Sequence, residues 1–306
     1  MRLTSGVAAV GLPLSPILGL GPILGLLLSA CSKPAEVAPA APAKPSDARA
    51  VLRVVAIPDA NKDRLRDDQM QIAAWIKAEL GVEAEIKPTS SYAGAVVALV
   101  SNQADVAWLG GVTTVDAMLK SKGEVLPLVS RAKDLEFKSY IIVKGDSPYK
   151  TVADLKGKKF TFGDQKSTSG HVMPRHLLAK EQGVAEAEKF FGLVAYSGNH
   201  DKTITDVRDG TFDAGAVNYS TYEKWAKEGK NKELVRVLWE TPKYVDYAWC
   251  VRNDIDQRFG AGTRDKLKKA FLGLDGSSDL EKTVMGANDN AGGKYVDALA
   301  KRCTGF

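Results

Sequence analysis

One segment of the chain has residue types suited to binding an anion: Ser-Thr-Ser-Gly-His at residues 167–171. It follows a strand-like run at residues 159–162 and overlaps the start of an expected helix at residues 169–181. The first turn of a helix has unpaired backbone N–H groups and a partial positive charge, and serine and threonine hydroxyls donate further hydrogen bonds. An ordinary helix cap explains one hydroxyl but not three in a row. The segment therefore predicts a cradle for an anion.

The elements that would position this loop follow from the alternation of apolar runs with amphipathic segments. Their strand, helix, strand order implies right-handed crossovers and parallel strand pairs. Strands are expected at residues 51–57, 82–86, 106–109, 125–129, 137–143, 159–162, 191–195, 214–217, 234–239 and 247–251. Helices are expected at residues 65–80, 92–100, 113–120, 169–181, 202–208 and 221–227, with a helical start at 151–155 and mainly helices after 257.

These elements divide into two α/β lobes, each expected to be a mostly parallel sheet flanked by helices. One lobe takes residues 51–134 and, because the tail folds back onto it, residues 245–306; the other takes residues 135–244. Strand ends and helix N-termini then face each other across a cleft, the usual ligand position in open parallel sheets. Site residues are therefore expected in loops after strands.

The beginning of the chain predicts export. A basic start is followed by an apolar stretch from about residue 7 to 28, which ends in Leu-Ser-Ala-Cys at residues 28–31. A membrane-spanning helix is the alternative, since such a helix needs roughly 20 apolar residues. Three prolines in the stretch oppose it by interrupting helical hydrogen bonding: Pro13, Pro16 and Pro22. Residues 1–30 are therefore predicted to be a lipoprotein signal peptide.

Cys31 is predicted to become the first mature residue and to carry the lipid, which would anchor the protein firmly. Residues 31–50 are rich in alanine and proline, a composition that builds no core and is typical of an extended tether. The protein would then be held at the periplasmic or cell-surface face of a bacterial membrane. Cys250 and Cys303 form an even pair in an oxidising compartment, where a disulfide between them is one option.

The composition of the 306 residues is that of a globular protein, with 44% hydrophobic and 26% charged residues. The net charge of +5 is spread along the chain and is compatible with an anionic ligand. No cluster of basic and aromatic residues indicates nucleic-acid binding. The protein is expected to be a monomer without a cofactor. No metal site is expected either, since the three histidines are poorly spaced for one: His171, His176 and His200.

The hydroxyl run, followed by Met173-Pro174, resembles the signature of the phosphonate/phosphite-type periplasmic solute-binding proteins of ABC transporters. The resemblance covers nearly all of residues 51–255 and includes further segments in the expected order: 91–92, 105–110, 151–158, 196–201 and 212–216. It implies a two-lobed periplasmic-binding-protein fold, type II-like, that captures a small tetrahedral oxyanion by hinge closure and delivers it to a membrane permease. It also implies that the protein is not an enzyme.

The resemblance also implies which residues touch the oxyanion. These are Tyr92, Ser167, Thr168, Ser169 and His200. Further candidates carry less weight: Asp59, Trp108, Gly110, His171, Asn218, Tyr244 and Asp246. Asp59 or Asp246 would meet the ammonium of an aminoalkylphosphonate, but Asn218, where a second carboxylate would be expected, favours a ligand without an amine.

Three other functions stay open. The sequence also resembles a branch labelled as selenate-binding, through residues 57–59 and 108–111. Tetrahedral oxyanions cannot be told apart by counting donors, whereas one carboxylate in the pocket would decide between protonated and fully ionised ligands. A binder of an apolar or aromatic nutrient would need an aromatic lining. A secreted hydrolase using Ser169 and His200 is the third, although the Gly-x-Ser-x-Gly elbow is missing.

Overall fold

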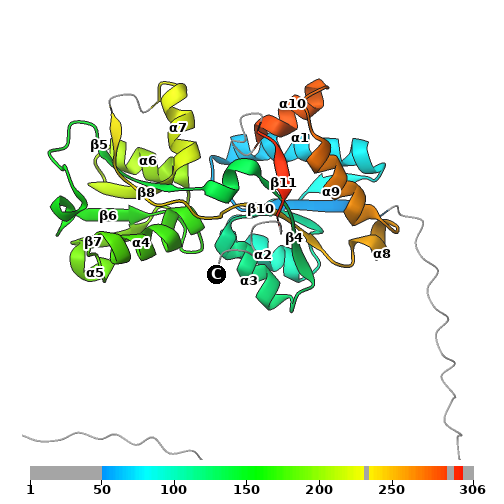
Figure 1. The fold of residues 1–306 in the computed structure, drawn as a ribbon, viewed down its shortest axis with the longest axis horizontal. Helices are drawn as coiled ribbons and strands as arrows, with labels where there is room; N and C mark the ends of the chain where they lie inside the picture. The colour runs from blue at the N-terminus through cyan, green and yellow to red at the C-terminus, as the bar shows by residue number, and fades with distance from the viewer. Residues whose placement is uncertain (1–49, 231–233, 288–292, 299–306) are drawn as a thin grey trace, which may run out of the picture. The chain divides into compact units, whose positions relative to one another are not determined.

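The computed structural model describes residues 50–230, 234–287 and 293–298, which build two α/β sheets (Figure 1). The predicted signal peptide and nearly all of the tether, with Cys31, lie outside the described residues, as does Cys303. Cys250 is buried, and its Sγ lies 3.5 Å from the Thr114 hydroxyl. Within the described ranges, no helix combines the length and apolar composition required to cross a membrane.

The first sheet has six strands in the order β11-β4-β10-β3-β1-β2. β1 pairs in parallel with β2 and β3, whereas β10 is antiparallel to β3 and β4, and β11 is antiparallel to β4. The strands are β1 (Leu52–Ala56), β2 (Ala84–Ile86), β3 (Val106–Leu109), β4 (Val125–Arg131), β10 (Ala248–Arg252) and β11 (Tyr295–Asp297).

The second sheet has five strands in the order β7-β6-β8-β5-β9. β6 pairs in parallel with β7 and β8, and β5 is antiparallel to β8 and β9. The strands are β5 (Ser139–Lys144), β6 (Lys159–Phe162), β7 (Leu193–Tyr196), β8 (Ala214–Asn218) and β9 (Val235–Glu240).

Both sheets are therefore mixed, which corrects the expectation of mostly parallel sheets. Parallel neighbours along the chain need a crossover, usually a helix. The strands β5 and β10 instead enter their sheets directly from the other sheet, without an α-helix before them, and both run antiparallel to their neighbours. β11 was not predicted, since the tail was expected to be mainly helical after residue 257.

Helices cover both sheets. With the six-stranded sheet are α1 (Lys62–Leu80), α2 (Tyr92–Val100), α3 (Gly111–Lys120), α8 (Ile255–Phe259), α9 (Thr263–Gly273) and α10 (Asp279–Gly286). With the five-stranded sheet are α4 (Met173–Glu181), α5 (Ala187–Phe190), α6 (His200–Arg208) and α7 (Tyr219–Lys227). Short turns of 3₁₀-helix occur at Ala132–Glu136 and Val152–Leu155.

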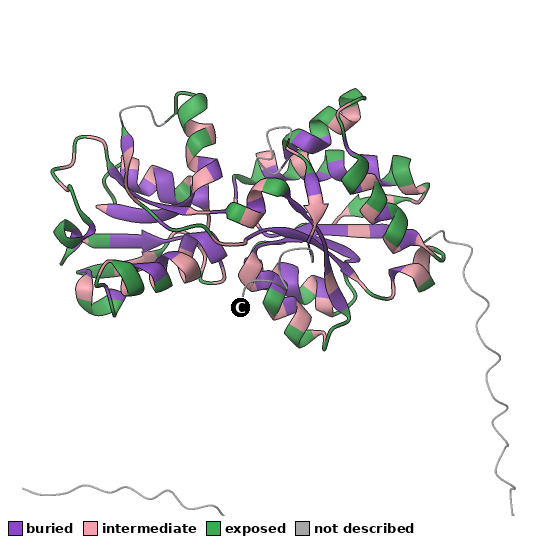
Figure 2. Ribbon diagram, viewed as in Figure 1, coloured by how far each residue is buried: buried purple, intermediate pink, exposed green. Residues whose placement is uncertain are grey.

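Most residues of the strands are buried (Figure 2). One apolar cluster surrounds the six-stranded sheet and contains Trp75, Trp249 and Phe271. The five-stranded sheet has a cluster on each face, because alternate residues of a strand point to opposite sides: Ile141 belongs to one and Ile142 to the other. Strand ends and helix starts are thereby held by packed cores.

Candidate ligand-binding site

The hydroxyl run forms an unusual helix start after strand β6. Ser167 precedes the turn, and its Oγ accepts a hydrogen bond of 2.9 Å from the Gly170 N–H. Residues Thr168–Val172 form a π-helical turn, a feature found frequently at functional sites, and α4 continues from it. A Cβ at Gly170 would lie 2.9 Å from the Ser167 Oγ and 3.1 Å from the Cε1 of His200. Glycine therefore permits the close packing of this loop.

The three hydroxyls of the run are all buried, but they differ in their partners. Ser167 acts as the helix cap described above. The Thr168 Oγ1 accepts a hydrogen bond of 3.0 Å from the N–H of Val112, in the first turn of α3. The Ser169 Oγ forms no hydrogen bond of good geometry in the part of the chain that the structure describes, although it lies close enough to Tyr244 and Asp246 to lower the pKa of both. Because a buried polar group without a partner costs about 1–3 kcal/mol, Ser169 marks a position where a ligand can supply the missing bond.

Tyr92 presents a second hydroxyl of this kind from the six-stranded sheet. It is the first residue of α2 and only 1% exposed, and its hydroxyl also forms no hydrogen bond of good geometry within the described ranges, although the Ser167 side chain lies close to it. Burial raises the pKa of this hydroxyl well above its usual value; the charge of Asp59 adds to the rise, and the Ser167 side chain opposes it. Tyr92 and the hydroxyl run therefore approach each other from elements of different sheets.

Asp246 joins this group from the segment that leads into β10. It is fully buried, and its Oδ1 accepts a hydrogen bond of 2.9 Å from the N–H of Gly111. Burial, followed by the charge of Asp134, raises the pKa of Asp246 to about 6, against the lowering effects of the Gly111 N–H and of the Thr168 and Ser169 hydroxyls. The carboxylate thus lies beside the hydroxyl run at the start of α3.

Gly110 makes this approach feasible, as the residue that precedes α3. An added Cβ there would lie 3.1 Å from the Thr168 Oγ1 and 3.2 Å from the Asp246 Oδ1. Because Gly110 has no side chain, Asp246 and Thr168 can come close to the backbone here. They accept hydrogen bonds from the next two N–H groups of the chain.

His200 is buried at the start of α6, next to Gly170. Its Nδ1 accepts a hydrogen bond of 3.3 Å from the N–H of Asn218, so in the neutral ring the proton is on Nε2. The Nε2 lies 3.4 Å from the hydroxyl of Tyr247, which also accepts a bond of 3.2 Å from the Asn218 amide. Ser169 makes no hydrogen bond to this ring, so the pair lacks the contact by which a base activates a nucleophile.

Three other predicted residues make packing contacts or hydrogen bonds that serve the fold. Trp108 stacks on Tyr247 at 5.2 Å between ring centroids, with the Arg131 guanidinium 4.7 Å from the Trp108 ring, and so packs in the core. Tyr244 hydrogen-bonds the Ser139 hydroxyl. The Nδ1 of His171 donates a hydrogen bond to the Gln165 carbonyl. Its Nε2 lies within hydrogen-bond distance of Arg175 and Tyr196, which were not among the predicted site residues. Its hydrogen bonds therefore do not join it to the hydroxyl run.

Two residues with a positioning role were absent from the predicted set. Tyr247 connects His200 to Trp108, and Arg131 lies over the Trp108 and Tyr247 rings while it pairs with Asp134. The sequence offered one signal for Tyr247, its place in the polar interlobe segment beside Asp246. No local pattern distinguishes Arg131 from the many other basic residues.

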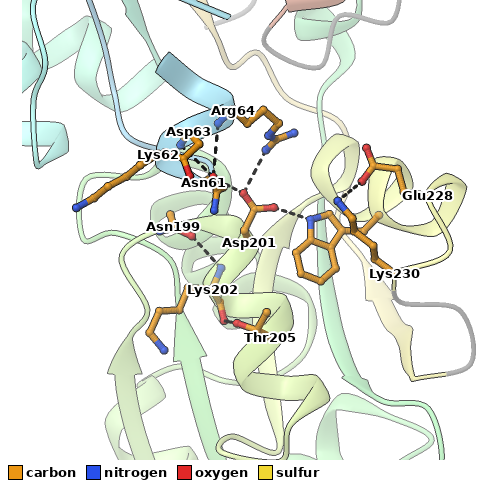
Figure 3. Close-up of a pocket in the computed structure, with 11 residues that line it drawn as sticks. Asn61, Lys62, Asp63, Arg64, Asn199, Asp201, Lys202, Thr205, Glu228 and Lys230 are labelled. Carbon is orange, nitrogen blue, oxygen red and sulfur yellow. Dashed lines mark hydrogen bonds and ion pairs between the residues drawn. The ribbon is translucent and has the colours of Figure 1, made fainter. Parts of the chain in front are cut away.

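A polar cavity of about 800 Å³ lies elsewhere, at the starts of α1 and α6 (Figure 3). Asp201 is central to it: its Oδ2 accepts bonds from the N–H of Asn61 at 2.6 Å and from Arg64 at 3.2 Å, and its Oδ1 accepts from the Trp225 indole. These contacts connect α1 of the six-stranded sheet with α6 and α7 of the five-stranded sheet. The lining residues are Asn61, Lys62, Asp63, Arg64, Asn199, Asp201, Lys202, Thr205, Trp225, Glu228 and Lys230.

Comparison with known proteins identifies the family of this chain. Residues 54–298 match the family described as the periplasmic substrate-binding protein of phosphonate ABC transporters. The chain is 35% identical over 243 residues to the probable ABC transporter phosphite binding protein PhnD1 of Prochlorococcus marinus, covering 77% of this chain and 81% of that protein. It is 27% identical to the phosphate-import protein PhnD of Mycolicibacterium smegmatis, covering 72% and 70% of the two chains.

A solved structure agrees with these matches. PhnD1 from Prochlorococcus marinus in complex with methylphosphonate has a TM-score of 0.77 and 33% sequence identity, and the match covers 83% of this chain and 94% of that one. The fold is thus the type II periplasmic-binding-protein fold, with two mixed sheets flanked by helices. The chain belongs to the phosphonate family of periplasmic substrate-binding proteins of ABC transporters.

Proposed function

We propose that this protein binds a small tetrahedral phosphorus oxyanion, such as phosphite or methylphosphonate, for import by an ABC permease. The observation that carries this proposal is the pair of buried hydroxyls that form no hydrogen bond of good geometry in the described residues, Tyr92 and Ser169, which come from elements of different sheets. Tyr92 lies beside the hydroxyl run, since its hydroxyl interacts with the Ser167 side chain, and buried hydroxyls beside a helix start suit an oxyanion and not an apolar nutrient. The methylphosphonate complex of the similar Prochlorococcus protein supports the same class of ligand.

The site residues divide into hydrogen-bond donors to the oxyanion and residues that shape the helix start. Tyr92 and Ser169 donate hydroxyl hydrogen bonds to the oxyanion, and His200 donates from Nε2 in place of its 3.4 Å contact with the Tyr247 hydroxyl. Ser167 and Thr168 hold the helix start in shape by accepting bonds from Gly170 and Val112, and a hydroxyl that accepts a bond can still donate its own hydrogen to the oxyanion. The remaining candidates lie around this group and carry no donor role in the proposal: Asp59, Gly110, Asn218, Tyr244 and Asp246.

The proposed setting is the outer side of a bacterial membrane. We infer a signal peptide over residues 1–30, a lipid anchor on Cys31 and a tether to residue 50, followed by lobes of residues 51–134 with 245–306 and of residues 135–244. The protein would act as a monomer that presents its loaded form to the permease. Labelling with radioactive palmitate checks the anchor: the full-length chain is expected to incorporate label and its Cys31→Ala variant is not.

Hinge closure around the ligand is part of the proposal and is supported by contacts between the two sheets. Besides the Thr168 bond to Val112, Lys166 forms an ion pair of 2.7 Å with Asp116 of α3, and Asp201 holds the start of α1. Closure expels water and strengthens each charge-assisted hydrogen bond to the ligand.

Removing the Asp201 carboxylate is expected to shift the protein towards an open state. Asp201→Ala deletes the acceptor for Asn61 and Arg64, contacts that exist only while the two sheets are together, and also the acceptor for Trp225 within the five-stranded half (Figure 3). A loss of about 1–2 kcal/mol from the closed state raises the ligand Kd about 5- to 30-fold, mostly through faster dissociation. Stopped-flow measurement of methylphosphonate release checks this.

The matched control for this variant is Glu228→Ala, since Glu228 lines the same cavity but pairs with Lys230. Its release rate should equal that of the unchanged protein. Equal release rates for Asp201→Ala and the unchanged protein would show that Asp201 does not hold the closed state.

A thermal-shift screen tests the proposed ligand class. A ligand at 100 times its Kd stabilises the folded state by about 2.7 kcal/mol. We expect a clear rise in Tm with phosphite or methylphosphonate and none with thiamine precursors. No response to any phosphorus oxyanion, with a response to an apolar nutrient, would refute the proposal and leave the hydroxyl run as a helix cap.

A further inference from the structure

A buried carboxylate among the proposed oxyanion donors is unexpected on charge alone. Asp246 lies beside Ser169 and Thr168, whose hydroxyls both act on its pKa, and it is fully buried. A site built from donors alone would bind a fully ionised oxyanion best, because a nearby negative charge repels it by several kcal/mol at short range. The presence of Asp246 therefore requires a reason.

Capping of α3 does not supply that reason. The Asp246 Oδ1 accepts the N–H of Gly111, but asparagine or serine would cap a helix start equally well without a charge. Gly110, which precedes α3, has no side chain to provide the cap itself, yet a neutral residue at position 246 would suffice. The negative charge adds a favourable interaction with the N-terminus of α3, up to about 2 kcal/mol, which does not by itself account for a fully buried carboxylate.

Charged and phenolic groups surround Asp246 and affect its pKa. Asp134, from the turn after β4, raises the Asp246 pKa through its charge, and Asp134 is itself paired with Arg131. The phenols of Tyr92 on α2, and of Tyr244 and Tyr247 on the same segment as Asp246, feel the Asp246 charge and remain protonated. With its pKa at about 6, Asp246 accepts a hydrogen bond from a protonated ligand at neutral pH.

We propose that Asp246 makes the site selective for oxyanions that carry an exchangeable proton, with one proton shared between the Asp246 carboxylate and a ligand oxygen. This inference rests on the proposed function and narrows it. Hydrogen phosphite, hydrogen phosphonates and hydrogen phosphate satisfy the carboxylate. Sulfate and selenate, which have no proton to donate at neutral pH, leave it facing a second negative charge.

The test is the pH dependence of binding by the full chain, measured by isothermal titration with methylphosphonate and with sulfate. The complex holds one proton, so the affinity for methylphosphonate is expected to fall about tenfold per pH unit once the free ligand has lost its second proton. A pocket of donors alone would show constant or rising affinity over the same range. Sulfate is expected to bind at least about tenfold more weakly than methylphosphonate at neutral pH.

Asp246→Asn keeps the cap on Gly111 but removes the charge, so it is expected to flatten the pH dependence and to narrow the gap between the two ligands at least about tenfold. Glu136→Gln is the matched control, because it removes an exposed carboxylate paired with Lys243 close to the same segment. The control should keep the pH profile of the unchanged protein.

The outcomes separate this inference from the function on which it rests. Binding of methylphosphonate with a Kd that does not rise with pH overturns the role of Asp246 alone. Equal affinity for sulfate and methylphosphonate does the same. A protein that binds neither ligand at any pH overturns the proposed function, and the inference with it.

Discussion

Ser169→Ala is expected to weaken methylphosphonate binding ten- to hundredfold while leaving the stability of the ligand-free protein unchanged or slightly higher. A hydrogen bond to a charged ligand contributes about 1–3 kcal/mol, which corresponds to that change in Kd. The Ser169 hydroxyl forms no hydrogen bond of good geometry in the described protein, so its deletion removes a buried polar group that costs free energy in the absence of ligand. Titration calorimetry and urea unfolding measure the two effects separately.

A matched control exists on strand β4. The Ser130 hydroxyl is equally buried and likewise has no partner among the residues described, but it lies outside the candidate site. Ser130→Ala should therefore have a similar effect on stability and none on the Kd. If Ser169→Ala binds as tightly as the unchanged protein, Ser169 does not contact the ligand.

Arg131→Leu is expected to lower the free energy of unfolding by about 3–5 kcal/mol, because it leaves the buried Asp134 charge without compensation. The pair is almost fully buried, with side-chain exposures of 2% and 0%, and the guanidinium holds both carboxylate oxygens, at 2.7 and 2.6 Å. It also lies over the rings of Trp108 and Tyr247, so the variant loses those contacts too. Urea unfolding monitored by circular dichroism measures the change.

The control for this prediction is the exposed ion pair between Arg208 and Asp209. Arg208→Leu should cost less than about 1 kcal/mol, since solvent screens such pairs. The double variant Arg131→Leu with Asp134→Leu should recover much of the loss, because the uncompensated charge is gone. A loss below about 1 kcal/mol for Arg131→Leu alone would contradict the prediction.

The sequence predicted the elements well where apolar periodicity is strong. The helix at 92–100 and the strands at 106–109 and 159–162 have the predicted bounds, because turn residues such as Gly110 and Gly163 mark where the apolar pattern ends. β11 was missed, since a three-residue strand has too few residues to show a period. The antiparallel pairing of β5 and β10 was also missed, because strand direction depends on how the chain crosses between sheets.

For the site, too, the sequence predicted the local segment but not the contacts between distant residues. The hydroxyl run was recognised as one unit, yet only the structure separates the capping Ser167 and Thr168 from Ser169, whose hydroxyl forms no hydrogen bond of good geometry in the described chain. The role of Asp201 depends on contacts with residues about 140 positions away, such as Asn61, and no local pattern reports them. Partners that are distant in sequence are set by tertiary packing.

The central claim is most directly tested by a crystal structure of the protein with methylphosphonate. The account predicts that the phosphonate oxygens lie within hydrogen-bond distance, about 2.5–3.0 Å, of both the Tyr92 and the Ser169 hydroxyls, with Asp246 against a protonated oxygen. Density for the ligand elsewhere, for example in the cavity around Asp201, with both hydroxyls still without a partner, would contradict it.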